Sequence, residues 1–344
     1  MPHNPLELAK QTEEIVVRDG KRPYRSISVE PFYRQIASAR SVGCNLRCRF
    51  CWIDKTRDYP RRTPPDTRWL TPEEVYEELM RVSNNGIMTE FVRITGCEPT
   101  IGREYLLSFL EVASVTARVR KRVLLETNGI LLGADESYVK ALRRYINNLS
   151  VRLSFKAGPT HFQQKTGAKA EYYDYQLAAL RYLEKHGIPF WIASMTRTAW
   201  FTSLDERRKL FLDIADTSND PRDLFTRGLL EEEEVDLFGI TRKRLMKKGL
   251  LPEEASQQDY EPLSASITRK VVEKLGITLE VATQESILEA RQRVSDHIAS
   301  LGKDGFIRLI QDSDFKVNPS CTGCHQCGKT VRHLVEDDSE IGKL

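Results

Sequence analysis

The chain has 344 residues, of which 40% are hydrophobic and 29% charged, a composition typical of a globular protein that buries a core. Its 52 basic and 49 acidic residues leave a net charge of +3, which is too balanced to indicate a nucleic-acid partner. No stretch approaches the roughly 18 apolar residues of a membrane span, and residues 1–20 lack the apolar segment of a signal peptide. We therefore expect a cytoplasmic protein.

Residues 1–35 show no clear periodicity, and we expect an N-terminal extension that packs on the main domain. A short β-compatible run from Gln35 to Val42 then leads into three closely spaced cysteines, Cys44, Cys48 and Cys51. Their spacing is C-x3-C-x2-C, and aromatic residues flank the third. Three thiolates at this spacing can hold three corners of a 4Fe–4S cluster, which needs four ligands, so one iron stays open for a substrate or cofactor.

The three cysteines could instead form a zinc knuckle or be unrelated residues of the core. Structural zinc sites prefer paired C-x2-C units with four ligands, which this motif does not complete. Buried free cysteine is common, but three such residues within eight positions favour a shared cluster.

Strands and helices alternate through the next part of the chain. Residues 54–66 are charged and proline-rich, which indicates a loop. Thr71, Pro72 and Glu74 form a capping box that begins a helix, and Gly86 is a plausible end. The predicted strands are 90–95, 122–127, 151–155 and 189–195, and the predicted helices between them are 104–117, 136–147 and 171–186. Such alternation predicts a parallel sheet with right-handed crossovers, here a partial (β/α)6 barrel of the TIM type.

The unusual residues of this half follow the strands. The cysteine motif follows the first strand, Gly96-Cys97-Glu98-Pro99 the second, Thr127-Asn128-Gly129 the third and Ser154-Phe155-Lys156 the fourth. Active sites of such barrels lie beyond the C-terminal ends of the strands. We therefore expect these four segments to meet at one rim.

The alternation weakens after Leu204. Residues 204–215, 231–248 and 284–300 are predicted helical, while 276–282 and 305–310 are candidate strands, the latter as the sixth barrel strand. The stretch 217–275 is predicted to be a helical insertion, and the acidic run 231–234 a solvated face. The predicted domains are the extension 1–35, a core 36–310 and a Cys-rich segment 311–344.

The cysteine motif and the rim segments resemble the radical S-adenosylmethionine (SAM) superfamily, over roughly residues 38–195. Within it, Lys156 and Glu126-Thr127-Asn128-Gly129 resemble the glycyl-radical-enzyme activases, and the nearest likeness is to a mainly archaeal branch close to the molybdenum-cofactor cyclase. The resemblance implies a cluster whose open iron chelates SAM and donates one electron to form a 5′-deoxyadenosyl radical.

The resemblance also implies which residues bind the cofactor. Glu98 supports the backbone that receives the SAM amino group, Lys156 engages its carboxylate, and Ser154 replaces an aspartate. Cys97 departs from the family by replacing a glycine, which the fold tolerates only where φ is not positive. The expected cofactor-binding residues are Trp52, Gly96, Cys97, Glu98, Pro99, Thr127, Asn128, Ser154 and Lys156.

A second cysteine group, Cys321, Cys324 and Cys327, has C-x2-C-x2-C spacing, which bacterial ferredoxins use for three ligands of a 4Fe–4S cluster. It predicts an auxiliary cluster; zinc and metal-free reactive thiols are the alternatives.

These observations predict a radical SAM enzyme that abstracts hydrogen from a small-molecule or peptide substrate. It would take electrons from a donor such as ferredoxin or flavodoxin. Two more functions stay open: an activase that makes a glycyl radical on a partner protein, and a non-catalytic iron–sulfur or zinc scaffold.

Overall fold

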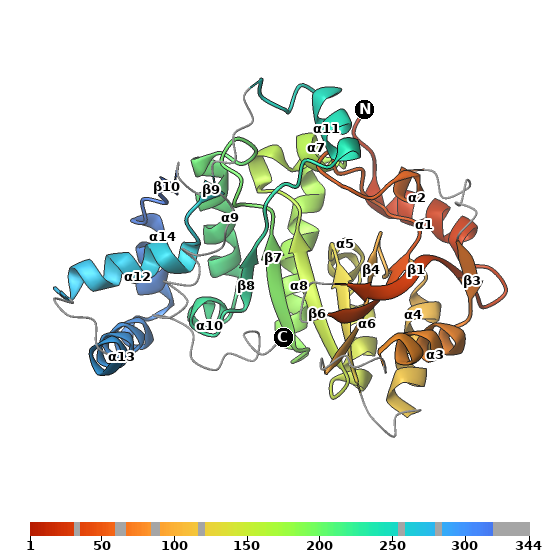
Figure 1. Ribbon diagram of the computed structural model, residues 1–344, viewed down its shortest axis with the longest axis horizontal. Helices are drawn as coiled ribbons and strands as arrows, with labels where there is room; N and C mark the ends of the chain where they lie inside the picture. Colours follow the sequence, from red (N-terminus) through yellow and green to blue (C-terminus); the bar gives the residue numbers. More distant parts are fainter. Residues whose placement is uncertain are drawn as a thin grey trace.

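The computed structural model describes residues 1–30, 35–58, 67–83, 90–115, 121–253, 259–278 and 284–318 (Figure 1). The strands are β1 (Arg22–Glu30), β2 (Ile36–Ser41), β3 (Arg68–Leu70), β4 (Phe91–Gly96), β5 (Arg122–Thr127), β6 (Leu149–Phe155), β7 (Phe190–Ser194), β8 (Leu230–Glu232), β9 (Asp259–Tyr260) and β10 (Val317–Asn318). The α-helices are α1 (Pro5–Val16), α2 (Lys55–Asp58), α3 (Pro72–Ser83), α4 (Arg103–Val115), α5 (Ile130–Ala134), α6 (Glu136–Leu142), α7 (Phe162–Thr166), α8 (Tyr173–Lys185), α9 (Leu204–Thr217), α10 (Pro221–Thr226), α11 (Gly239–Met246), α12 (Leu263–Lys274), α13 (Gln284–Ser300) and α14 (Lys303–Gln311).

The main sheet has eight strands in the order β3-β1-β2-β4-β5-β6-β7-β8. Its last six strands are mutually parallel, and helices connect them. The predicted α/β fold with a parallel, partial barrel is therefore confirmed. The strands β4 to β7 lie within one or two residues of their predicted bounds because each is a short apolar run between clear helices.

The first residues of the chain do more than pack on the barrel. β1 pairs antiparallel with β2 and with β3, so it extends the sheet beyond the first barrel strand. The preceding helix α1 is capped by Asn4, whose side chain accepts hydrogen bonds from the amides of Leu6 and Glu7. Its buried face contacts Val42 and Ile101, next to the cysteine motif and the loop after β4.

The sixth barrel strand is β8, and its predicted position at 305–310 is wrong. Those residues belong to α14, where Phe306 and Ile310 are buried one helical turn apart. β8 lies inside the stretch 217–275, for which the sequence predicts a helical insertion, and it contains Leu-Glu-Glu rather than an apolar run. Likewise, the predicted helix 231–248 is confined to α11. Residues 277 and 278 are not in a strand, while 279–282 lie outside the described residues.

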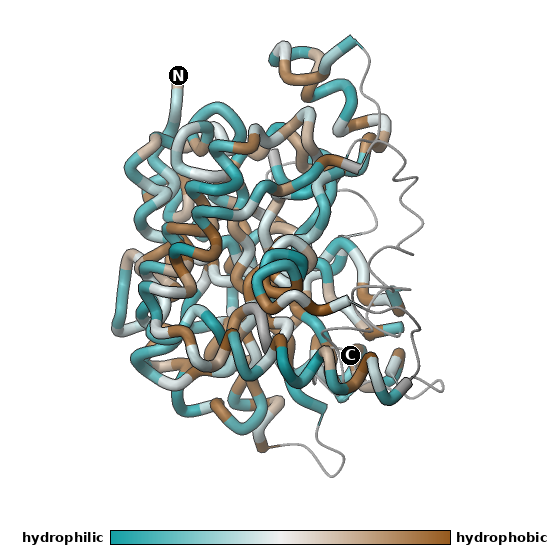
Figure 2. Tube along the Cα trace, turned by 90° about the vertical axis from the view of Figure 1, so that its left-hand side faces the viewer, coloured by the Kyte–Doolittle hydropathy of each residue, from teal (hydrophilic) through white to brown (hydrophobic). Residues whose placement is uncertain are grey.

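Helices cover the outer face of the sheet and enclose the main hydrophobic core. Hydrophobic and hydrophilic segments alternate along most of the trace, as expected where each element has one buried face (Figure 2). A smaller buried apolar group, Ile36, Phe91, Leu124 and Trp191, lies toward the N-terminal ends of the barrel strands. The predicted capping box of α3 is present: Thr71 N donates to Glu74 and Glu74 N donates to the Thr71 hydroxyl.

The elements after β7, apart from β8 and α11, lie beside the β7–β8 edge of the sheet, and they include the small β9–β10 pair. Over the described ranges, no helix is long and apolar enough to cross a membrane.

Candidate active site

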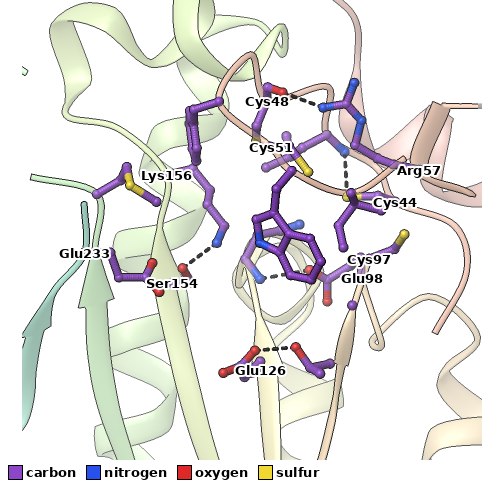
Figure 3. Close-up of a pocket in the computed structure, with 18 of the residues that line it drawn as sticks. Cys44, Cys48, Cys51, Arg57, Cys97, Glu98, Glu126, Ser154, Lys156 and Glu233 are labelled. Atoms are coloured by element: carbon purple, nitrogen blue, oxygen red, sulfur yellow. Dashed lines mark hydrogen bonds between the residues drawn. The ribbon is translucent and has the colours of Figure 1, made fainter. Parts of the chain in front are cut away.

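A cavity of about 200 Å³ lies at the C-terminal ends of the barrel strands (Figure 3). The four predicted rim segments all contribute to its wall, together with Met195 after β7 and residues 233–236 after β8. Of the predicted site residues, those that line it are Cys44, Cys48, Cys51, Trp52, Gly96, Cys97, Glu98, Thr127, Asn128, Ser154 and Lys156. Pro99 is not among the lining residues, and its carbonyl accepts a hydrogen bond from Arg22. Cys321, Cys324 and Cys327 lie outside the described residues.

The loop that carries the three cysteines is held by backbone contacts. The amides of Arg47 and Arg49 donate to the carbonyls of Thr166 and Lys165 at 2.9 and 2.8 Å. These acceptors belong to α7, the segment after the fourth predicted strand. The segment that follows β6 therefore supplies both Lys156 and the carbonyls that hold the cysteine loop. This arrangement fixes the position of the lysine relative to the cysteines.

The three thiols are crowded together. Burial, the charge of Glu98 and the charge of Cys51 raise the pKa of Cys44 to about 11. Burial and the charges of Cys51 and Cys44 raise the pKa of Cys48 to about 12. The thiolates of Cys44 and Cys48 therefore need a positively charged partner here, and the irons of an iron–sulfur cluster are such a partner because they coordinate thiolates directly.

Across the described part of the chain, no three His, Cys, Asp or Glu side chains are placed to hold one metal ion. A cubane cluster places each cysteine on a separate iron, so this finding concerns single-ion sites only. The donor set of three cysteine sulfurs around a shared cavity fits a cluster.

The segment after β4 contains two residues that the geometry constrains. Gly96 has φ +102°, and a Cβ there would lie 2.9 Å from the backbone N and O of Ser41. This position therefore requires glycine. Cys97, which stands where the resembled pattern has a glycine, is not among the described non-glycine residues with positive φ, so its side chain introduces no backbone strain. It lies beside Cys44 (Figure 3).

Glu98 joins three rim segments. Its carboxylate is fully buried and accepts hydrogen bonds from the Thr100 amide and hydroxyl at 3.1 and 2.6 Å, the Thr127 hydroxyl at 2.6 Å and the Asn128 amide at 2.8 Å. The Asn128 side chain in turn donates to Asn45, next to Cys44, at 2.8 Å. These contacts lock the cysteine loop, the segment after β4 and the end of β5 together.

Sequence reasoning missed a buried arginine behind this group. Arg22 of β1 is 1% exposed and donates to the carbonyls of Pro99, Ile101, Val42 and Glu98 at 2.5 to 3.2 Å. A guanidinium can satisfy several carbonyls at once because it carries five donors in a fixed plane. The residues it joins are 20 to 79 positions away, so no local pattern reveals the role.

Lys156 extends from the end of β6 into the cavity. Its ammonium donates to the Ser154 hydroxyl, and among the described residues no carboxylate forms an ion pair with it. Gln176 of α8 supports this region from behind, because its amide donates to the carbonyls of Asn128 and Ser154. Lys156 is thus a cation in a cavity with room for an anionic partner.

Alternating charges cross the barrel below the cavity. Glu126 lies 3.3 Å from Arg93 and 3.5 Å from Arg152, and Arg152 also contacts Glu231 at 2.8 Å and Glu233 at 2.7 Å. Burial alone would raise the pKa of Glu126, but the charges of Arg93 and Arg152 outweigh it and hold the pKa below its ordinary value. The floor of the cavity is therefore ionic rather than apolar.

The acidic run 231–234 is not a solvated face, contrary to the prediction. Glu231 and Glu233 pair with Arg152, Glu232 pairs with the fully buried Arg207 at 2.6 Å, and Glu234 lies 3.7 Å from Arg197. The buried arginine partners explain how a run of glutamates can form the last barrel strand and the wall beside it.

Two further arginines hold the cysteine loop from outside the predicted motifs. Arg57 of α2 donates to the Cys48 carbonyl. Arg244 of α11 donates to the carbonyls of Cys51 and Ile53, each at 2.6 Å. The helix that follows the β8 wall therefore also touches the loop of the third cysteine.

Trp52 lines both the main cavity and a smaller one of about 160 Å³. Its side chain is 47% exposed, and the guanidinium of Arg40 lies 5.1 Å from the centre of its ring. The residue is therefore placed at the mouth of the site rather than in its interior.

Residues 39–198 match the family model described as the Radical SAM superfamily. The chain is 32% identical over 144 residues to GTP 3′,8-cyclase from Haemophilus ducreyi, covering 40% of this chain and 38% of that protein. It is 34% identical over 114 residues to the same enzyme from Actinobacillus pleuropneumoniae serotype 5b, covering 31% and 30%. The chain thus spans about two fifths or less of these curated relatives.

Solved structures with a similar arrangement include a spore photoproduct lyase variant, with a TM-score of 0.48 and 13% identity over 84% of this chain and 81% of that one. Another is native anSMEcpe with bound AdoMet, with a TM-score of 0.41 and 20% identity over 57% and 50%.

Proposed function

We propose that this chain, a radical SAM enzyme through its residues 39–198, cleaves SAM reductively and abstracts hydrogen from a small-molecule or peptide substrate. The observation that carries the proposal is the shared cavity. Three crowded cysteines, the segment anchored by Glu98 and an ammonium without a direct ion pair among the described residues all face one space. When bound, the cluster and SAM would supply a 5′-deoxyadenosyl radical, which is chemistry that the cofactor contributes rather than the protein.

The residues of the chain would divide the remaining tasks. Cys44, Cys48 and Cys51 would bind three irons, and Lys156 would pair with the SAM carboxylate. The segment 96–99, held rigid by Glu98, would receive the amino group. Rigid placement of a reactive group lowers the entropic cost of reaching the reacting geometry.

We place the substrate against the wall formed by Met195 and residues 233–236. The cysteine loop and the Glu98 segment, where the cofactor would bind, lie across the cavity from this wall, and Lys156 lies between them and Glu233 (Figure 3). The ionic floor formed by Glu126, Arg152 and Glu233 supports a substrate with polar groups, because an apolar molecule would displace water from these charged groups without replacing its hydrogen bonds.

We further propose that Cys321, Cys324 and Cys327 hold an auxiliary 4Fe–4S cluster, or zinc in its place. Their spacing supports this proposal.

The test is anaerobic reconstitution with iron and sulfide, followed by SAM and dithionite and an assay for 5′-deoxyadenosine. The wild-type protein should form the product, and the variant with Cys44, Cys48 and Cys51 all changed to alanine should not. Product formation at the normal rate by that variant would refute the ligand assignment.

A further inference from the structure

The helix α11 carries a dense and unbalanced positive charge. Residues 238–250 contain no Asp or Glu and five basic residues, Arg242, Lys243, Arg244, Lys247 and Lys248. Arg244 faces the cysteine loop, and the side chains of the other four are exposed. We call these four residues, with Phe238 and Met246, the basic surface.

The basic surface also contains two exposed apolar side chains. Phe238 is 56% exposed and Met246 62% exposed, at the two ends of α11. A solvated helix face needs no such residues. A protein-docking face commonly combines aromatic or methionine side chains with a charged surround, because the apolar contacts provide affinity and the charges steer the encounter.

The basic surface is next to the proposed cluster. Arg244 donates hydrogen bonds to the carbonyls of Cys51 and Ile53, and these contacts hold α11 against the loop of the third cysteine. Arg244 also donates to the Asp54 carbonyl at 3.4 Å. The next residue, Lys55, is exposed and adds a further positive charge. A molecule bound to α11 would therefore lie close to the iron held by Cys51.

We propose that the basic surface is the docking site for an acidic, one-electron carrier protein of the flavodoxin or ferredoxin class, an inference that rests on the proposed function. One electron would pass from the reduced carrier to the oxidised cluster, with no proton or bond transferred. Electron-transfer encounters use small interfaces, typically under about 1,200 Å², which matches a surface centred on one short helix.

Charge also selects the partner. Long-range attraction to an acidic protein would raise the association rate and weaken with added salt. RNA is a second class of polyanion, but the close approach of α11 to the cysteine loop favours a partner that delivers electrons.

The test compares two reductants and two matched variants of the full, reconstituted protein. The variant Lys247→Glu/Lys248→Glu reverses two charges of the basic surface. The control Lys274→Glu/Arg308→Glu makes the same change in net charge on exposed residues of α12 and α14. Each protein is assayed for 5′-deoxyadenosine with dithionite, which needs no docking, and with a purified, reduced flavodoxin. Binding of oxidised flavodoxin and binding of total transfer RNA are measured separately by titration calorimetry at low and high salt.

We expect the α11 variant to match the wild type with dithionite but to lose about tenfold in the flavodoxin-dependent rate and in flavodoxin affinity, while the control variant stays near the wild type. An α11 variant that equals the control in both flavodoxin measurements would overturn the proposal. So would a loss of binding to total transfer RNA without a loss of flavodoxin binding. Absence of product from the wild type with dithionite would instead refute the proposed function, and the calorimetry would still decide the docking question.

Discussion

Lys156 is the single residue on which the cofactor proposal can be tested most directly. Its ammonium donates to the Ser154 hydroxyl and interacts with the charges of Glu126 and Glu233, but it forms no direct ion pair among the described residues, so a SAM carboxylate would be its direct ionic partner. Lys156→Ala should weaken SAM binding by roughly tenfold or more, because removing one member of a desolvated charge pair costs on the order of 2 kcal/mol or more. Iron content should stay normal. Equilibrium dialysis with labelled SAM measures the change.

The matched control for this change is Lys169→Ala. Lys169 is exposed, and its nearest partner is Glu171 at 4.0 Å. Its loss should leave SAM affinity unchanged. Equal SAM affinity in the Lys156 variant and the wild type would make Lys156 a structural residue.

Asp259 gives a prediction about pH. Burial and the charge of Glu234 raise the pKa of its carboxyl to about 6, above its value of about 4 in an unfolded chain. The folded state therefore binds this proton more tightly than the unfolded state. The contribution to stability is present at low pH and is lost as pH rises from about 4 to about 6.

Asp259→Asn should remove this dependence because an amide does not titrate. Relative to the variant, the wild type should become less stable as pH rises from about 4 to about 6, with little further change above that. Urea unfolding at several pH values measures the difference. A wild type that instead gains stability relative to the variant over this range would show that the pKa of Asp259 is lowered.

At the residue scale, the sequence is informative where a residue carries chemistry in a short motif. The cysteines, Glu98 and Lys156 each follow a predicted strand, and the parallel fold then places them at one edge. Arg22 and Arg244 cannot be found in this way. Both donate to backbone carbonyls of distant segments. Because every residue has a backbone carbonyl, the sequence contains no pattern that marks the ones they bind.

At the scale of elements, β1 is a structural part of the site. Arg22→Gln should destabilise the protein by about 3 kcal/mol or more, because several buried carbonyls around the Glu98 segment lose charge-assisted hydrogen bonds. The control Arg25→Gln alters the same strand at a half-exposed residue whose ion pair with Asp54 spans 3.6 Å, and it should cost less than about 1 kcal/mol.

Chemical denaturation of the two metal-free variants measures both changes. Similar losses of stability in the two would show that Arg22 contributes no more than an ordinary strand residue.

The helix α11 should protect the cysteine loop. In metal-free protein, Arg244→Gln should raise the rate at which iodoacetamide alkylates Cys51 by roughly tenfold, because losing about 1.4 kcal/mol of restraint increases loop opening by that factor. Peptide mass mapping follows the reaction at each cysteine.

Arg242→Gln is the control, since Arg242 is exposed on the same helix. If the two variants react equally fast at Cys51, Arg244 has no role in holding the loop.

Elements are predictable where hydrophobic periodicity agrees with the final fold. The strand β8 escapes such a prediction because its glutamates are neutralised by Arg152 and Arg207, which come from β6 and α9. Residues 305–310 resemble a strand in sequence because a short apolar run fits either element, and only packing distinguishes the two.

At the scale of the whole molecule, metal content tests the Cys-rich segment. If Cys321, Cys324 and Cys327 hold a second cubane, the reconstituted protein should contain about eight irons, and the variant with all three changed to alanine about four. SAM cleavage at the first cluster should continue in that variant, while turnover of the substrate should be lost. Metal analysis of the two proteins side by side measures this.

Zinc would give a different result: about four irons and one zinc in the wild type, with loss of zinc and of stability in the variant. A wild type with about four irons and no zinc would contradict both metal assignments and leave free thiols.

The strand β8 and helix α11 are consecutive in the chain, and they join the two sides of the cavity. Residues 233–236 form the wall proposed for the substrate, and a short distance further along the chain Arg244 holds the loop of Cys51. Where two binding events that act on one short segment influence each other, thermodynamics requires the influence to be reciprocal. If cluster loading tightens substrate binding by some factor, bound substrate must tighten retention of the cluster by the same factor. Bound substrate would then stabilise the cluster in the protein, and a chelator would remove iron more slowly when substrate is present.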